Sequence, residues 1–191
     1  MTAPAIDKDA LRSKYAEERD KRLRPDGASQ YKRLETEFTD LATDPYTPRQ
    51  HREPVTDHVT FAFIGGGFAG LVVGARLKEA GFADYRIIEK GGDFGGTWYW
   101  NRYPGAQCDT ASMIYMPLLE ETGYMPSKKF ADGWEIQAYC QKMAEDFDLA
   151  DKALFHTLVE SIVWDETIKR WHVKTNRGDD IKARFVIMAG G

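Results

Sequence analysis

Three glycines at a fixed spacing are the residues of this sequence that most directly suggest chemistry. Gly65, Gly67 and Gly70 follow the apolar run at 59–64 and open an apolar-rich segment of helical length. This order predicts a strand, a tight turn and a helix. Gly65 allows the sharp turn, Gly67 lets a pyrophosphate approach the backbone, and Gly70 lets the helix pack closely on the sheet. Free N–H groups and the helix dipole favour an anion at such a helix start.

A carboxylate follows where this motif needs one. The apolar segment 85–88 ends at Glu89, which stands about 20 residues beyond the glycines, the distance that the dinucleotide-binding motif requires. At the end of a second strand, a carboxylate can accept hydrogen bonds from the ribose hydroxyls of adenosine. The simpler interpretation is a glycine turn followed by a surface glutamate.

Residues 95–105 are unusually rich in glycine and aromatic side chains, with the sequence Gly-Gly-Thr-Trp-Tyr-Trp-Asn-Arg-Tyr-Pro-Gly. Such a density of aromatic residues is not typical of a solvated loop. Beside a dinucleotide fold, these side chains could line the flat face of a ring-shaped cofactor. They could equally form a local cluster that covers the end of the sheet, and the spacing alone leaves both interpretations open.

The composition narrows the class of protein. The chain has 191 residues, of which 42% are hydrophobic and 29% charged, as in ordinary soluble globular proteins. A net charge of -4 gives no basic field for nucleic acid, and the longest apolar runs are too short for a membrane span. The two cysteines form no disulfide framework and the four histidines show no metal-ligand spacing. The polar first ten residues lack a signal-peptide core, so we expect a cytoplasmic protein.

The first part of the chain, residues 1–56, is expected to be a helical and extended N-terminal extension. Charge and sparse apolar positions predict a mostly solvated helix over 7–24, with Asp9 as a plausible cap. Apolar residues spaced by three and four predict a second helix over 29–41, and three prolines predict an extended linker over 42–55. The extension either packs on the main domain or binds a partner.

The remainder, residues 57–191, is expected to be an α/β domain with a Rossmann-like parallel sheet and an antiparallel β-meander. Polar residues predict a loop over 118–129, and apolar periodicity predicts a helix over 134–147. After the first βαβ unit, the expected strands are 153–159, the hairpin pair 161–164 and 171–175, and 182–191.

Taken together, these motifs resemble one family. The glycine fingerprint, Glu89, the 95–105 stretch and the pair Cys108-Asp109 are similar to those of type I Baeyer–Villiger monooxygenases, over residues 58–191. The resemblance implies a flavoprotein with two dinucleotide domains that uses FAD, NADPH and oxygen. Such an enzyme converts ketones to esters or lactones through a flavin C4a-peroxide. The extension resembles that of a subgroup that handles bulky or large-ring ketones.

The resemblance also implies roles for individual residues. FAD would be contacted by Gly65, Gly67, Phe68, Gly70, Glu89, Thr97, Trp98, Trp100, Tyr115 and the backbone of Val159. Gln107 and Cys108 would face the nicotinamide cofactor. Asp109 would position the catalytic arginine, although without the family match it could equally be a turn-capping residue. A buried carboxylate in that role should be paired.

Two departures from the family pattern bear on this interpretation. The family's NADPH domain, its catalytic arginine and its F-x-G-x-x-x-H-x-x-x-W fingerprint are not found in residues 1–191. We therefore expect an incomplete FAD-binding domain that does not turn over by itself. In addition, Ala189-Gly190-Gly191 stands where the family usually has Ala-Thr/Ser-Gly. A related flavin monooxygenase acting on nitrogen or sulfur, and a non-catalytic dinucleotide-binding or interaction module, are the alternatives.

Overall fold

The structure is a computed structural model that describes residues 6–31 and 43–191. Its contacts divide the chain into two compact units, Met1–Thr43 and Asp44–Gly191. The boundary therefore lies earlier than the expected one after residue 56, because 44–55 packs with the second unit. None of the helices in the described ranges has the length and apolar character needed to cross a membrane.

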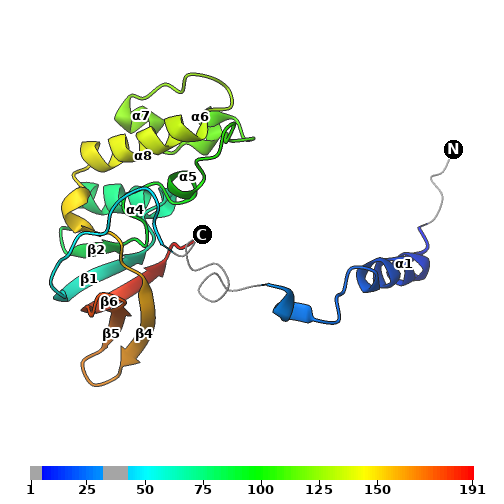
Figure 1. Cartoon of the computed structure of the whole chain (residues 1–191), viewed down its shortest axis with the longest axis horizontal. Coiled ribbons are helices and arrows are strands. Elements are labelled where there is room, and N and C mark those ends of the chain that lie inside the picture. Colours follow the sequence, from blue (N-terminus) through cyan, green and yellow to red (C-terminus); the bar gives the residue numbers. More distant parts are fainter. Residues whose placement is uncertain (1–5, 32–42) are drawn as a thin grey trace. The chain divides into compact units, whose positions relative to one another are not determined.

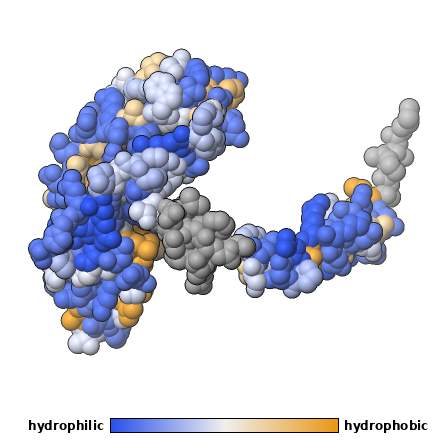
Figure 2. Space-filling view, viewed as in Figure 1, coloured by the Kyte–Doolittle hydropathy of each residue, from blue (hydrophilic) through white to orange (hydrophobic). Residues whose placement is uncertain are grey.

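The first unit contains a solvated helix, as predicted, but with different ends. Helix α1 spans Lys8–Asp20, and none of its residues is buried. Its cap is Asp7 rather than Asp9, because the Asp7 carboxylate accepts hydrogen bonds from the first free N–H groups of the helix. A 3-10 helix η1 follows at Gly27–Gln30. The second predicted helix, over 29–41, lies mostly outside the described residues. The surface of α1 is mainly hydrophilic (Figure 2).

The second unit is built on one mixed sheet of six strands in the order β3-β2-β1-β6-β5-β4. Strands β1, β2, β3 and β6 run parallel, whereas β4, β5 and β6 form an antiparallel meander. The strands are β1 Thr56–Ile64, β2 Tyr85–Ile88, β3 Ala153–Leu154, β4 Val159–Asp165, β5 Arg170–Thr175 and β6 Asp180–Met188. The predicted Rossmann-like sheet with a β-meander is confirmed.

Two longer helices lie on the same side of the sheet, α4 (Phe68–Glu79) and α8 (Gly133–Asp146) (Figure 1). The main core cluster joins them to β1 and β2 through buried side chains such as Phe63, Leu71 and Ile136. A second cluster, which includes Val59 and Ile181, covers the opposite face of the strands. Burial on both faces explains why β1 reads as a nearly continuous apolar run.

The connections contain short helical turns: α5 Thr97–Trp100, α6 Ser112–Tyr115, α7 Leu119–Thr122 and the 3-10 helix η2 Ala150–Lys152. The predicted loop 118–129 therefore includes one helical turn. The predicted strand 153–159 is wrong in its middle, because His156 has a positive φ of 49° and breaks the strand. The backbone N–H of His156 donates instead to the Gly91 carbonyl.

Candidate functional site

One cavity lies where the parallel strands end, at the point where the strand order reverses. The chain leaves β1 at Gly65, β2 at Glu89 and β6 at Ala189, and all three residues line a cavity of about 610 Å³. β2 and β6 flank β1 on opposite sides, so the crevice is at the topological switch point of the sheet. Open α/β sheets bind ligands at this position.

The glycine turn forms the floor of the cavity, and its glycines are required by close backbone contacts. Gly65 has a φ of 117°, and a Cβ there would lie 2.5 Å from the Ala189 carbonyl oxygen. Gly70 is buried beneath the turn, where a Cβ would lie 2.2 Å from the Gly65 oxygen. Helix α4 then starts behind Gly67, without a capping side chain among the described residues. An uncapped helix start that faces a cavity is suited to an anion.

Glu89 holds this turn in place from the neighbouring strand. Its side chain is 5% exposed. One carboxylate oxygen accepts the Gly66 N–H at 2.6 Å, and the other accepts the Gly91 N–H at 2.6 Å. Each carboxylate oxygen has a second lone pair, so the group can still accept bonds from a bound molecule. Glu89 therefore ties two glycine turns together and presents a negative charge to the cavity.

A further glycine turn, at Gly95 and Gly96, positions the aromatic stretch. The Gly95 N–H donates to the Gly66 carbonyl at 3.0 Å. A Cβ on Gly96 would lie only 2.9 Å from the Gly67 Cα, so the two turns are in direct backbone contact. Helix α5 begins immediately after Gly96. Trp98 and Trp100 are thereby brought to the mouth of the Gly65–Gly70 turn, and both line the cavity.

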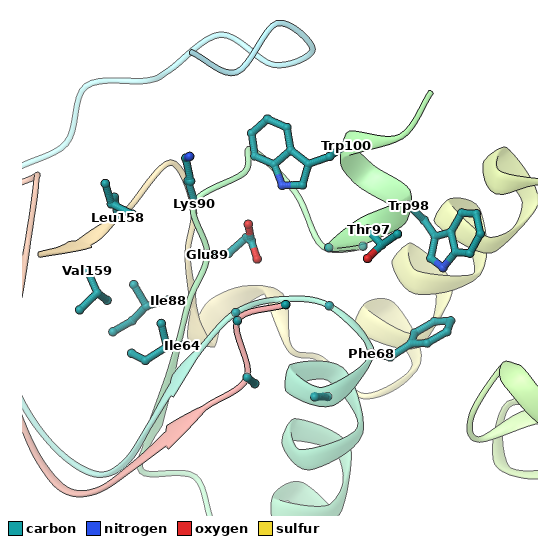
Figure 3. A pocket seen from close by; sticks show the side chains of 18 of the residues that line it. Ile64, Phe68, Ile88, Glu89, Lys90, Thr97, Trp98, Trp100, Leu158 and Val159 are labelled. Carbon is teal, nitrogen blue, oxygen red and sulfur yellow. The ribbon is translucent and has the colours of Figure 1, made fainter. Parts of the chain in front are cut away.

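Aromatic side chains form one end of the cavity. Figure 3 shows Phe68, Thr97 and Trp98 at this end, with Trp100 above Glu89. The Trp98 indole N–H donates to the Tyr115 hydroxyl at 2.9 Å, and the two rings meet edge to face. Burial raises the pKa of the Tyr115 hydroxyl, so it stays neutral at ordinary pH.

Aliphatic side chains form the opposite end. Ile64, Ile88, Leu158 and Val159 lie there, away from the aromatic group, with Lys90 beside them (Figure 3). Val159 is placed by the break in the expected strand, because β4 starts at this residue after the turn at His156. From one end to the other, the cavity thus has an apolar pocket, a glycine turn with a carboxylate, and an aromatic wall.

Most of the predicted site residues meet in this one cavity, but four do not line it. Gly70 is buried below it. Gln107 is exposed and forms an isolated bridge with Asp132. Cys108 is buried at 5% exposure, and Asp109 is exposed to solvent. The structure therefore does not place Asp109 as the buried carboxylate that we expected. Nine predicted residues do line the cavity: Gly65, Gly67, Phe68, Glu89, Thr97, Trp98, Trp100, Tyr115 and Val159.

Several residues that line the cavity were not among the predicted ones. They include Lys90, Asn101, Thr157 and Leu158, each of which lies within two residues of a predicted one. Thr157 and Leu158 could have been inferred from Val159, since all three belong to the turn that leads into β4. Lys90 and Asn101 directly follow predicted residues, but a single sequence does not show which way their side chains point.

The arrangement fits an extended molecule with a diphosphate in its middle and a ring at each end. The glycine turn and the start of α4 suit the diphosphate, because added Cβ atoms would collide with backbone there. Glu89 suits a ribose, the aliphatic end suits one base, and the indole-lined end suits a second flat ring. These features match FAD.

This chain is similar to several known proteins. Residues 64–126 match the family described as NAD(P)-binding Rossmann-like domain. A protein of Streptomyces coelicolor called Baeyer-Villiger monooxygenase is 50% identical over 95% of this chain and 30% of its own length. The solved polycyclic ketone monooxygenase of Thermothelomyces thermophila is 38% identical, with a TM-score of 0.83 over 96% of this chain and 32% of that one. The solved OTEMO complex with FAD and NADP is 31% identical, with a TM-score of 0.65 over 73% of this chain and 26% of that one.

The predicted resemblance to Baeyer–Villiger monooxygenases is therefore confirmed. The chain spans about a third of the length of the relatives that it matches. Within that third, the similarity covers nearly the whole chain, including the glycine turn, Glu89 and the aromatic stretch.

Proposed function

We propose that this chain forms the FAD-binding region of a Baeyer–Villiger monooxygenase that uses NADPH and oxygen to convert ketones to esters or lactones. The observation that carries the proposal is one cavity that joins the Gly65–Gly70 turn to the indoles of Trp98 and Trp100. A general dinucleotide-binding domain needs the turn but has no need for the indole wall.

Each part of the cavity has a defined task in this proposal. The N–H groups at the start of α4 bind the diphosphate, and Glu89 accepts hydrogen bonds from the adenosine ribose. Val159 and its aliphatic neighbours contact the adenine. Thr97, Trp98 and Trp100 lie along the isoalloxazine and its side chain, and the Trp98–Tyr115 hydrogen bond fixes the orientation of the indole.

When bound, FAD supplies the redox chemistry by which NADPH and oxygen act on a ketone. The aromatic residues of this chain exclude water from the reacting face, which protects reactive species from hydrolysis. In our proposal, Asp109 orients an arginine supplied from outside residues 1–191, and Gln107 and Cys108 approach the nicotinamide. The exposure of Asp109 in this unit leaves it accessible to such a group.

The first test is whether the chain binds FAD. After incubation with FAD and desalting, we expect a bound flavin spectrum, with NAD failing to compete. Glu89→Gln and Trp100→Ala should each weaken retention, because the first removes the charge and one of the two acceptor oxygens and the second removes part of the ring wall. If NAD displaces FAD, the aromatic end does not hold a flavin and the proposal is wrong.

The second test addresses the reaction. A chimera would join this chain to the remaining two thirds of the Streptomyces coelicolor relative, which is 50% identical to it. With NADPH and oxygen, we expect lactone from a cyclic ketone. N-oxide or S-oxide formation without lactone would favour the related class of flavin monooxygenases. NADPH consumption without any oxygenated product would contradict both.

A further inference from the structure

The segment Asp44–Thr47 packs against the outside of the cofactor cavity. One oxygen of the Asp44 carboxylate accepts the Gly92 N–H at 2.8 Å and the Tyr99 hydroxyl at 2.6 Å. The other oxygen accepts the Tyr46 N–H at 2.9 Å, which fixes the local turn. The Asp44 side chain is 9% exposed. A carboxylate that is nearly buried and fully hydrogen-bonded holds its partners with strong, charge-assisted bonds.

Tyr99 connects this segment to the indole wall. Its side chain points away from the cavity and is 1% exposed, whereas its neighbours Trp98 and Trp100 line the cavity. Thr47 shares a hydrogen bond of 2.9 Å with the Tyr99 hydroxyl. The Tyr46 hydroxyl donates to the Trp100 carbonyl at 3.1 Å. The segment Asp44–Thr47 therefore forms hydrogen bonds to two successive residues of α5, Tyr99 and Trp100.

The same carboxylate also holds the turn behind Glu89. Gly92 follows Gly91, whose N–H donates to Glu89 inside the cavity. The fit around Gly92 is tight, since a Cβ there would lie 2.6 Å from both Thr47 and His156. His156 Nε2 lies 3.7 Å from the Asp44 carboxylate. Asp44 thus forms hydrogen bonds to Gly92 and Tyr99, which are far from it in sequence and lie within two residues of ones that line the cavity.

We propose that Asp44 is a positioning residue for the cofactor cavity. It fixes the position of Trp100 through Tyr99. It also fixes the position of the ribose-binding carboxylate of Glu89 through the Gly91–Gly92 turn. The identity of the ligand rests on the proposed function, but the positioning is a property of the chain itself. A segment that precedes the first strand thereby becomes part of the site.

The test compares Asp44→Asn and Tyr99→Phe with wild type in the full 191-residue chain. Asp44→Asn replaces one acceptor oxygen by an N–H₂ donor, so the side chain can no longer accept from both the Gly92 and the Tyr46 N–H. In Tyr99→Phe the ring stays but its hydroxyl is lost. We expect faster hydrogen exchange at the Gly92 amide in Asp44→Asn, and about tenfold weaker FAD binding in both variants. The emission of bound flavin should rise toward that of Trp100→Phe, because the indole no longer lies against the ring.

Asp165→Asn is the matched control. Asp165 also accepts two backbone N–H groups, from Thr167 at 2.7 Å and Ile168 at 3.2 Å, but it is the last residue of β4 and does not line the cavity. It should leave Gly92 exchange, FAD affinity and flavin emission unchanged. Thr47→Val and Thr47→Ser provide a second pair if Asp44→Asn does not fold. Valine should weaken FAD binding, whereas serine, which keeps the hydroxyl, should restore it.

The outcomes separate the two proposals. Unchanged Gly92 exchange in Asp44→Asn would overturn the positioning role. So would faster exchange with wild-type FAD affinity and emission, because Asp44 would then only anchor its own segment. If the wild-type chain binds no FAD, the proposed function fails. In that case the indole N–H resonance of Trp100 decides the positioning role, which requires that this resonance shift in Asp44→Asn but not in Asp165→Asn.

Discussion

At the scale of single residues, two glycines of α4 differ in what surrounds them. A Cβ on Gly70 would lie 2.2 Å from the backbone oxygen of Gly65, which cannot move without opening the turn. A Cβ on Gly74 would meet only the side-chain ends of Leu149 and Ile87, at 3.2 and 3.3 Å. Both substitutions gain the same helix propensity.

We therefore expect Gly70→Ala to lower the free energy of unfolding by about 3 kcal/mol, from overpacking against backbone. Gly74→Ala should change it by less than about 1 kcal/mol, because the gain in propensity offsets the small crowding. Urea denaturation of the two variants measures the difference. Equal stability of Gly70→Ala and wild type would show that the turn is not as closely packed as the structure has it.

Glu135 provides a matched comparison for Glu89 in the same domain. Glu135 is also a buried carboxylate, at 2% exposure, and its oxygens accept bonds from Ser127 and Tyr124 rather than from the glycine turns. Both Glu89→Gln and Glu135→Gln should cost about 2 kcal/mol of stability, because each places an amide N–H₂ group against a donor. Only Glu89→Gln should also weaken FAD binding. Titration with FAD distinguishes a site residue from a structural one, and equal affinities would remove Glu89 from the site.

At the scale of elements, a buried ion pair ties the segment before β1 to the β5–β6 turn. Arg52 donates to both oxygens of Asp179, at 2.6 and 2.7 Å, and the Asp179 side chain is fully buried. Burial alone would raise the pKa of the Asp179 carboxyl. Hydrogen bonds from Arg52, Thr175 and the Val55 N–H outweigh it and lower the pKa to about 2.

A carboxyl whose pKa is lower in the folded state stabilises the fold above its unfolded pKa, which is about 3.9. This contribution is lost as the pH falls from about 4 to about 2, and we expect the free energy of unfolding to fall over that range. Asp179→Asn should lower the free energy of unfolding by about 3 kcal/mol at neutral pH, since it leaves Arg52 unpaired. It should also reduce the fall of this free energy between about pH 4 and about pH 2. Denaturation at several pH values checks both effects. If the free energy of unfolding falls over this pH range as steeply in Asp179→Asn as in wild type, another carboxyl causes the fall.

At the scale of the whole molecule, the two compact units predict where the chain can be shortened. Deleting residues 1–43 removes α1, which has no buried residue, and should leave the unfolding midpoint of the second unit unchanged. Deleting 1–55 also removes Asp44 and Arg52, so the buried Asp179 loses its partner. That deletion should cost at least about 3 kcal/mol. Thermal unfolding of the two truncated chains checks the boundary, and equal midpoints would return it to residue 56.

Much of this organisation was determined by the sequence. The glycine spacing, the acidic residue after the second strand and the short apolar runs of the strands are local patterns, and they depend on backbone geometry that neighbouring residues dictate. They gave the Rossmann-like sheet, the meander and three of the residues that line the cavity, Gly65, Gly67 and Glu89, whereas the other six followed from the family resemblance. The aromatic stretch 95–105 carried the family resemblance for the same reason, because its chemistry lies within one short segment.

Only the tertiary structure decided which distant segments share the site. Nothing in the sequence near Asp44 indicates that its carboxylate binds Gly92 and Tyr99, because such contacts depend on how the whole chain packs. The same holds for the pairing of Arg52 with Asp179 and for the exposure of Asp109. Local patterns fix elements through nearby backbone and side-chain geometry, whereas burial and long-range hydrogen bonds arise only when the elements pack together.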